Sequence, residues 1–314
     1  MHQQQPWAVI LAGGNGSRLQ ALTRRVSGDG RPKQFCSLCG EHTLLTQTRL
    51  RLSRAVARER TLFSVVREHE RFYTRELADV RPSRIAVQPA NKGTTVAIIY
   101  TLHWLLEIAG PDEDPIVGFF PTDHYYADEQ RFVAAVDLAF KVCRRHPESL
   151  LLLGAEAQYP EVEYGWIEPS ADVQRGAANS LFRVSRFWEK PSLHVAEMLL
   201  ARGCLWNTFV MIGRAKAFLD MLNSAWSDLL EPFETIGRRG GAINLDDLYE
   251  KLPSGDFSRQ VLSSCAPWLT VLAIGNIGWS DLGTPERVAS VTRSMEAAGQ
   301  RVRRDENFAQ SWEF

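Results

Sequence analysis

Residues 7–12 read WAVILA, and residues 13–19, which follow at once, read GGNGSRL. The first stretch is short, apolar and bounded by glycine, which predicts a buried strand. Open α/β sheets bind ligands at the carboxyl ends of their strands, so the glycine-rich loop lies where a ligand is expected. Glycine lets a backbone approach an anion and direct successive N–H groups at it, and Arg18 adds a planar cation. We therefore predict a phosphate-binding loop that contains Leu11, Ala12, Gly13, Gly14, Gly16 and Ser17.

Two familiar phosphate-binding motifs do not match this loop. A dinucleotide-binding motif requires a third glycine where this chain has Leu19, and a Walker loop requires Gly-Lys-Ser/Thr where it has Gly16-Ser17-Arg18. A tight turn that binds no ligand stays open as the alternative for the loop taken alone.

The rest of the chain alternates strand-like and helix-like segments. Apolar runs at 61–66, 84–88, 116–120 and 150–154 are typical of strands, whereas 44–56, 94–108 and 130–144 have a helical period. This order predicts an α/β fold with a mostly parallel sheet covered by helices on both faces. In the second half, 164–169 and 180–188 are expected to pair antiparallel, and further strands are expected at 205–212 and 268–274.

The domain organisation follows from the absence of a Pro/Gly/Ser-rich linker and of internal repeats. We expect one domain over residues 1–300, with two halves, at about 1–155 and about 156–300, that share a cleft. The polar residues 301–314 are expected to form a surface extension.

Composition excludes several classes of protein. With 45% hydrophobic residues and a net charge of −1, the chain is expected to be globular and to lack the broad positive field that binds nucleic acid. The arginines between Arg49 and Arg60 are interpreted as the solvated face of a helix, with a minor interaction patch as the alternative. No membrane span or signal peptide is expected, which predicts a cytoplasmic protein. Its five cysteines are expected to be reduced, and Cys36 and Cys39 lack the second pair that a zinc site needs.

A second cation, Lys33, lies in residues 31–35 (RPKQF), within reach of the same phosphates. GGNGSRL followed by PKQF resembles the N-terminal signature of the sugar-1-phosphate nucleotidylyltransferases, most of all the mannose-1-phosphate guanylyltransferases. The resemblance continues in the same order along nearly the whole chain: QP at 88–89, FPTDH at 120–124, YGWIE at 164–168, FWEKP at 187–191, LWN at 205–207 and GWSDLG at 278–283.

The resemblance implies a Rossmann-like, mostly parallel (mixed) sheet, with a nucleotide-binding half at about 1–155 and a smaller sugar-binding lobe in the half at about 156–300. It also implies that a nucleoside triphosphate reacts with a sugar 1-phosphate. Asp123, directly after a predicted strand, is a candidate Mg²⁺ ligand, and Asp281 matches the second ligand of the family. Lys190 is implied to contact the sugar phosphate and Glu189 a sugar hydroxyl, with Gly165 and Asn207 beside the sugar. Gln88, Gly93 and Thr94 are expected to border the base.

The reaction requires positive charge, because a phosphate dianion approaches a nucleotide that carries about four negative charges. Each pair of like unit charges 4 Å apart repels by about 4 kcal/mol at an effective dielectric constant of 20. The nucleophile is already an oxyanion, so no general base is needed, and catalysis consists of charge neutralisation and alignment. The residues expected to take part in catalysis are Arg18, Lys33, Asp123, Lys190 and Asp281.

Structural alternatives stay open for these residues. Asp123 and Asp281 could cap or begin helices, and Glu189 with Lys190 could be surface charge. His124 is interpreted as a hydrogen-bonded structural histidine, and Trp206 as part of the core.

Three functions stay open at this point. The first is an active enzyme, with GTP and mannose 1-phosphate favoured over another base and glucose 1-phosphate. The second is a regulatory homologue that binds a nucleotide sugar without catalysis, and the third is an unrelated nucleotide-dependent enzyme. The sequence Lys92-Gly93-Thr94 departs from the guanylyltransferase pattern, and Asp256 aligns only loosely with a family aspartate. The C-terminal extension of many relatives is not expected after Gly283, so no oligomeric contacts are inferred from it. A homodimer is left open as the assembly.

Overall fold

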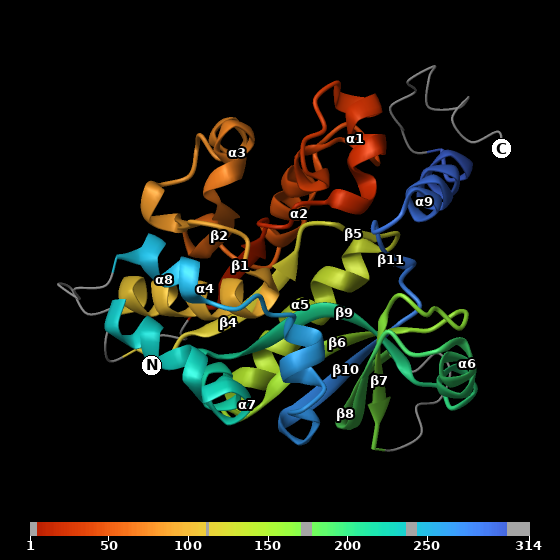
Figure 1. The fold of residues 1–314 in the computed structure, drawn as a ribbon. Coiled ribbons are helices and arrows are strands. Elements are labelled where there is room, and N and C mark those ends of the chain that lie inside the picture. The colour runs from red at the N-terminus through yellow and green to blue at the C-terminus, as the bar shows by residue number, and fades with distance from the viewer. Residues whose placement is uncertain (1–4, 111–112, 171–177, 237–243, 300–314) are drawn as a thin grey trace.

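The computed structural model describes residues 5–110, 113–170, 178–236 and 244–299. Within them, a nine-stranded sheet has the order β3-β2-β1-β4-β9-β6-β10-β8-β7, and β7 also pairs with β9 (Figure 1). Strands from both halves of the sequence therefore share one sheet. Its members are β1 Trp7–Leu11, β2 Thr61–Val66, β3 Ile85–Gln88, β4 Ile116–Pro121, β6 Leu150–Glu156, β7 Gly165–Pro169, β8 Ala178–Glu189, β9 Leu205–Arg214 and β10 Leu269–Gly275.

The predicted α/β fold is confirmed. The sheet has a parallel part and a mostly antiparallel part. Strands β1 to β4 pair in parallel, with Ala8 opposite Thr61 and Trp7 opposite Val117. Beyond β4, β9 runs antiparallel to both β4 and β6, and β7 pairs antiparallel with β8, as expected. The only parallel pair among these later described strands is β6 with β10. The sheet is therefore mixed, and its parallel part is the one that carries the glycine loop.

Helices cover both faces because side chains of each buried strand alternate between two cores. Val9 packs in one core with α4, α7 and α8, whereas Ile10 packs in the other with α2, α3, α5 and α6. A third, smaller core lies between α1 and α9. The last described helix, α9, therefore lies near α1 (Figure 1). The helices are α1 Gln20–Ser27, α2 Leu44–Leu52, α3 Glu70–Glu76, α4 Gly93–Ala109, α5 Glu129–Arg145, α6 Leu193–Ala201, α7 Ala215–Ile236, α8 Leu245–Lys251 and α9 Pro285–Ala297.

Short helical turns connect these elements: η1 Ser17–Leu19, η2 Lys33–Phe35, η3 Arg58–Arg60, η4 Arg67–His69, η5 Pro82–Arg84, η6 Ser258–Leu262 and η7 Ala266–Trp268. No helix in the described ranges combines the length and the apolar character that crossing a bilayer requires. The five cysteines are buried free thiols. The polar residues 301–314, which were predicted to form a surface extension, lie outside the described residues.

A small second sheet, which the sequence analysis did not predict, joins β5 His124–Tyr126 to β11 Trp279–Asp281. The strands are antiparallel, with Asp281 opposite His124, and the N–H of Leu282 donates to the carbonyl of Asp123 at 2.8 Å. Strands of three residues are too short to show a periodic pattern. Their pairing brings together two segments that are about 155 residues apart in sequence.

The arginine cluster is only partly solvated, which corrects its interpretation as a solvated helix face. Arg54 is exposed, but the side chain of Arg51 is only 3% exposed, and its Nε donates to Glu129 at 2.8 Å. Its guanidinium also lies over the ring of Tyr126, 4.9 Å from the centroid. Arg51 is buried because α2 packs against α5, and Glu129 compensates its charge.

The N-terminus of α4 is held by a segment that precedes η6. The N–H of Thr95 donates to the carbonyl of Gly255 at 3.1 Å, and the N–H of Gly255 donates to the carbonyl of Lys92 at 2.8 Å. Gly93 has a φ of +84°, and a Cβ at this position would collide with the Gly255 carbonyl. Glycine is therefore required at residue 93 both for its backbone angle and for this close approach.

Replacing Gly93 with alanine is expected to destabilise the protein more than the same change at Gly28. Gly28 also has a positive φ, +79°, but an added Cβ there meets no atom within 4 Å. Gly28→Ala should cost about 1–2 kcal/mol for the backbone angle alone. Gly93→Ala should cost about a further 1–3 kcal/mol for the collision. Urea denaturation measures both, and equal free energies of unfolding would contradict the proposed contact.

Candidate active site

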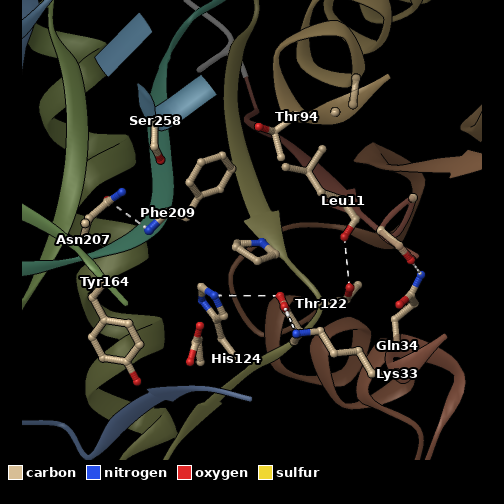
Figure 2. A pocket seen from close by; sticks show the side chains of 18 of the residues that line it. Leu11, Lys33, Gln34, Thr94, Thr122, His124, Tyr164, Asn207, Phe209 and Ser258 are labelled. Carbon is tan, nitrogen blue, oxygen red and sulfur yellow. Dashed lines mark hydrogen bonds and ion pairs between the residues drawn. The ribbon is translucent and has the colours of Figure 1, made fainter. Parts of the chain in front are cut away.

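A cavity of about 400 Å³ lies where the parallel strands end. Leu11 at the end of β1, Gln88 at the end of β3 and Pro121 at the end of β4 all line it, as the position of the glycine loop predicted. Thr94 and Ser258 lie on the opposite side of the cavity from Lys33 and His124 (Figure 2).

The glycine loop contributes Gly13 and Gly14 to the cavity wall. Gln34, which the sequence analysis did not single out, holds the loop: its Nε2 donates to the carbonyls of Ala12 at 2.9 Å and Gly14 at 2.8 Å. Its place directly after Lys33 in the RPKQF stretch was the available signal in the sequence.

Three predicted loop residues do not line the cavity: Ala12, Gly16 and Ser17. Ala12 is buried and its N–H already donates to the carbonyl of Ser64. Gly16 has a φ of +63°, and a Cβ there would lie 3.0 Å from the N atom of Lys33, so glycine permits the turn. Ser17 begins η1. These residues shape the loop, and the cavity wall is formed by their neighbours.

The three predicted cations all line this cavity: Arg18, Lys33 and Lys190. Lys33 Nζ lies 2.6 Å from Asp123 Oδ2 and donates to the carbonyl of Leu282 at 3.0 Å. Lys33 thus connects the segment that follows β4 to the segment that follows β11.

Arg18 and Lys190 share one partner, Glu163, which the sequence analysis missed. Its Oε2 lies 3.3 Å from Arg18 Nη1 and 3.6 Å from Lys190 Nζ. No motif marks this residue, because the two cations that it connects are far apart in sequence. Glu163 therefore places a negative charge between the nucleotide side and the sugar side of the cavity.

The two predicted metal ligands, Asp123 and Asp281, line the same cavity on the paired segments that carry β5 and β11. Burial raises the pKa of Asp123, but the charge and the hydrogen bond of Lys33 lower it more, and the net pKa lies far below the usual range. Asp281 accepts from Arg287 Nη1 at 2.5 Å, and Arg287 Nη2 lies 3.1 Å from Glu161. Both carboxylates are therefore paired with a cation.

This pair of acids fits Mg²⁺, which prefers one or two carboxylates together with phosphate oxygens and water. In the part of the chain that the structure describes, no group of three or more His, Cys, Asp or Glu side chains could hold a metal ion. A dedicated protein cage is therefore not formed by these residues, and bound phosphates would supply the remaining ligands.

His124 is hydrogen-bonded, in agreement with its structural interpretation. Its Nδ1 accepts from Trp279 Nε1 at 3.3 Å, and its Nε2 lies 3.8 Å from Asp123 Oδ1. Burial lowers the pKa of His124, which favours the neutral ring. Trp206 is buried among Tyr164 and Trp279, as its predicted core role requires.

The predicted sugar-side residues, Gly165, Glu189, Lys190 and Asn207, all line the cavity. A Cβ on Gly165 would lie 3.0 Å from Glu189 Oε2, so glycine keeps this wall open. Burial, together with the charge of Asp256, raises the pKa of Glu189 to about 7. Asn207 accepts from the N–H of Phe209 at 3.0 Å, which fixes the orientation of its side-chain amide.

The predicted base-side residues line the cavity but are engaged with the protein. Gln88 Nε2 donates to Ser64 at 3.1 Å, and Gln88 Oε1 accepts from Tyr249 at 3.4 Å. Two N–H groups at the start of α4 are also bonded within the protein. The N–H of Gly93 donates to Asn91 Oδ1, and that of Thr95 to the carbonyl of Gly255. These two donors are therefore already engaged.

Comparisons with known proteins agree with this architecture. The family model described as "Nucleotidyl transferase" matches residues 7–298. Xanthan biosynthesis protein XanB of Xanthomonas campestris pv. campestris (strain ATCC 33913) is 33% identical over 284 residues, which are 88% of this chain and 57% of the relative. Mannose-1-phosphate guanylyltransferase 2 of Escherichia coli O157:H7 is 28% identical over 289 residues, with 88% and 58% coverage. The chain thus spans less than two thirds of the length of these relatives.

Solved structures share the fold. A Thermus thermophilus crystal structure named as a mannose-1-phosphate geranyltransferase superposes with a TM-score of 0.76 at 27% identity, over 91% of this chain and 79% of the other. A putative glucose-1-phosphate thymidylyltransferase from Bacillus anthracis has the same fold, with a TM-score of 0.57 at 16% identity and coverage of 96% and 98%. The resemblance seen in the sequence is confirmed, and the chain belongs to the nucleotidyl transferase family.

Proposed function

We propose that this protein joins a nucleoside triphosphate to a hexose 1-phosphate and releases pyrophosphate, with GTP and mannose 1-phosphate as the favoured substrates. A phosphate oxygen of the sugar would form a bond to the α-phosphorus, and the bond from that phosphorus to the bridging oxygen of the β-phosphate would break. One observation carries the proposal: the three cations Arg18, Lys33 and Lys190 and the two candidate metal ligands, which come from distant parts of the chain, line a single cavity. Two further carboxylates, Glu163 and Glu189, line it as well.

The cations answer the main obstacle to the reaction, which is repulsion between two anionic substrates. Arg18, beside the glycine loop, and Lys33 lie on the nucleotide side, whereas Lys190 follows β8 on the sugar side. Electrostatic stabilisation by such fixed charges is a large part of catalysis in phosphoryl transfer. The proposal therefore assigns Arg18 and Lys33 to the phosphates of the nucleotide and Lys190 to the phosphate of the sugar.

Asp123 and Asp281 are the residues that would hold Mg²⁺. When bound there, the ion would supply a positive charge that polarises phosphate oxygens. In the protein alone, Lys33 and Arg287 neutralise these two carboxylates. We infer that Lys33 is redirected from Asp123 toward a phosphate when substrate binds, because both are anionic partners within the same cavity.

The regulatory alternative, binding without catalysis, gives no role to the two aspartates. They face the cavity together and are kept by specific cation partners, which favours the active enzyme. The base and the sugar rest on the names of relatives and on sequence resemblance. Another base with glucose 1-phosphate is the second choice.

Pyrophosphate release tests the proposal directly. Release is expected with Mg²⁺ and a matched pair of substrates, most rapidly for GTP with mannose 1-phosphate, and is expected to be lost when the ion is chelated. The assay compares four nucleoside triphosphates with mannose, glucose and galactose 1-phosphates. No release from any pair in the presence of Mg²⁺ would leave the binding-only homologue as the better explanation.

Asp281→Asn is expected to lower kcat by about 100-fold while the KM for the nucleotide changes less than about threefold. The reason is that several kcal/mol of charge stabilisation by a bound metal would be lost in the transition state, and each 1.36 kcal/mol is a factor of ten. Asp220→Asn is the matched control, because Asp220 pairs with Lys216 on the exposed surface of α7. Steady-state kinetics measure both, and unchanged kcat in Asp281→Asn would remove this residue from the metal site.

Glu163→Gln is expected to lower the KM for the sugar phosphate by about two- to fivefold and to leave kcat nearly unchanged. Glu163 competes with phosphates for Arg18 and Lys190, and exposed ion pairs of this kind contribute about 0.2–1 kcal/mol. Glu148→Gln, at an exposed position before β6, is the control. A higher KM in Glu163→Gln would instead show that this carboxylate contacts the substrate.

A further inference from the structure

A second cavity, of about 560 Å³, lies near the amino ends of β2 and β3, and it shares no lining residue with the proposed active site. Thr61, which begins β2, and Arg84, which precedes β3, both line it, as does Arg49 of α2. This is the region of the arginine cluster that the sequence analysis left without a role. We propose that the cavity is a second anion site, which binds a small molecule that carries a phosphate group.

The first argument is the charge of the wall. Four arginines line the cavity, Arg49, Arg58, Arg81 and Arg84, together with two acids, Glu59 and Asp79. Asp79 is already taken, since Arg49 Nη2 donates to both of its carboxylate oxygens at 2.8 and 2.7 Å. Within the described ranges, no carboxylate forms an ion pair with the other three arginines. The cavity therefore has an excess of positive charge.

The second argument is the environment of Arg84. Its Nη1 is buried and has no hydrogen-bond acceptor among the residues that the structure describes. Its guanidinium lies over Trp7, 4.5 Å from the ring centroid, and Arg60 lies over the same indole at 5.1 Å. A buried donor left without a partner is unfavourable, and more so when it is charged. Burial, with the charges of Arg60 and Arg81, lowers the pKa of Arg84. Because Arg84 lines the cavity, an anion bound there would compensate its charge.

The chemistry of the wall favours phosphate among anions. Guanidinium groups match the geometry of phosphate oxygens and bind them through two parallel hydrogen bonds. Phe63 and Val80 add apolar surface beside the arginines, which suits an organic phosphate better than a bare ion. A long nucleic acid would need a broad positive field, and the chain has a net charge of −1.

Calorimetry can isolate this site from the first cavity. The full chain with Arg18→Gln, which weakens phosphate binding at the proposed active site, is titrated with inorganic phosphate. When Arg81→Gln or Arg84→Gln is combined with Arg18→Gln, the Kd for phosphate is expected to rise at least about tenfold. The reason is that a hydrogen bond to a charged group contributes about 1.5–3 kcal/mol. Addition of Arg145→Gln, which removes an exposed charge from the end of α5, should change it less than about twofold.

Two comparisons keep the outcome clear. Arg81 is exposed, so Arg81→Gln tests the site even if Arg84→Gln disturbs packing on Trp7, and thermal melting checks both variants. Titrations with guanosine monophosphate and with a hexose 6-phosphate distinguish a nucleotide from a sugar phosphate, and tighter binding of either than of phosphate supports the proposal. Equal Kd values in the Arg81, Arg84 and Arg145 variants would overturn it. So would binding of duplex DNA without binding of any small phosphate.

Discussion

The site depends on the interaction of Lys33 with two segments of the chain, one beside β5 and one beside β11. Its ammonium pairs with Asp123 at 2.6 Å and donates to the carbonyl of Leu282 at 3.0 Å, while the backbones of those two residues are hydrogen-bonded to each other. Without this cation, the partly buried carboxylate of Asp123 would lack the positive charge that it now contacts, which would cost free energy. The same contact orders the two segments that carry the candidate metal ligands.

Each of the three cations that line the cavity has a carboxylate partner in the protein itself. Lys33 pairs with Asp123, and Arg18 and Lys190 share Glu163. This arrangement prevents uncompensated positive charge from accumulating in the cavity. Under the proposed function, phosphates of the substrates would replace these carboxylates as the partners of the cations. The affinity for substrate would then be a difference between two sets of ion pairs.

Several polar residues near the expected base pocket form hydrogen bonds within the protein. Gln88 is held by Ser64 and Tyr249, and Thr94 accepts from the N–H of Phe257 at 2.9 Å. These bonds fix the wall against which a base would lie, as preformed pockets require. The second, arginine-lined cavity differs in this respect, because the buried donor of Arg84 has no such partner among the described residues.

Buried strands and collinear motifs are local signals, and they were enough to predict the α/β fold, the place of the glycine loop and the family. The resemblance carried by those motifs also indicated which acids and cations share one cavity. The folded chain was needed to reveal the β5–β11 pairing, the burial of Arg51 and the bridging position of Glu163. Each of these features depends on contacts between segments distant in the chain, and neither periodicity nor spacing encodes which side chains will meet there.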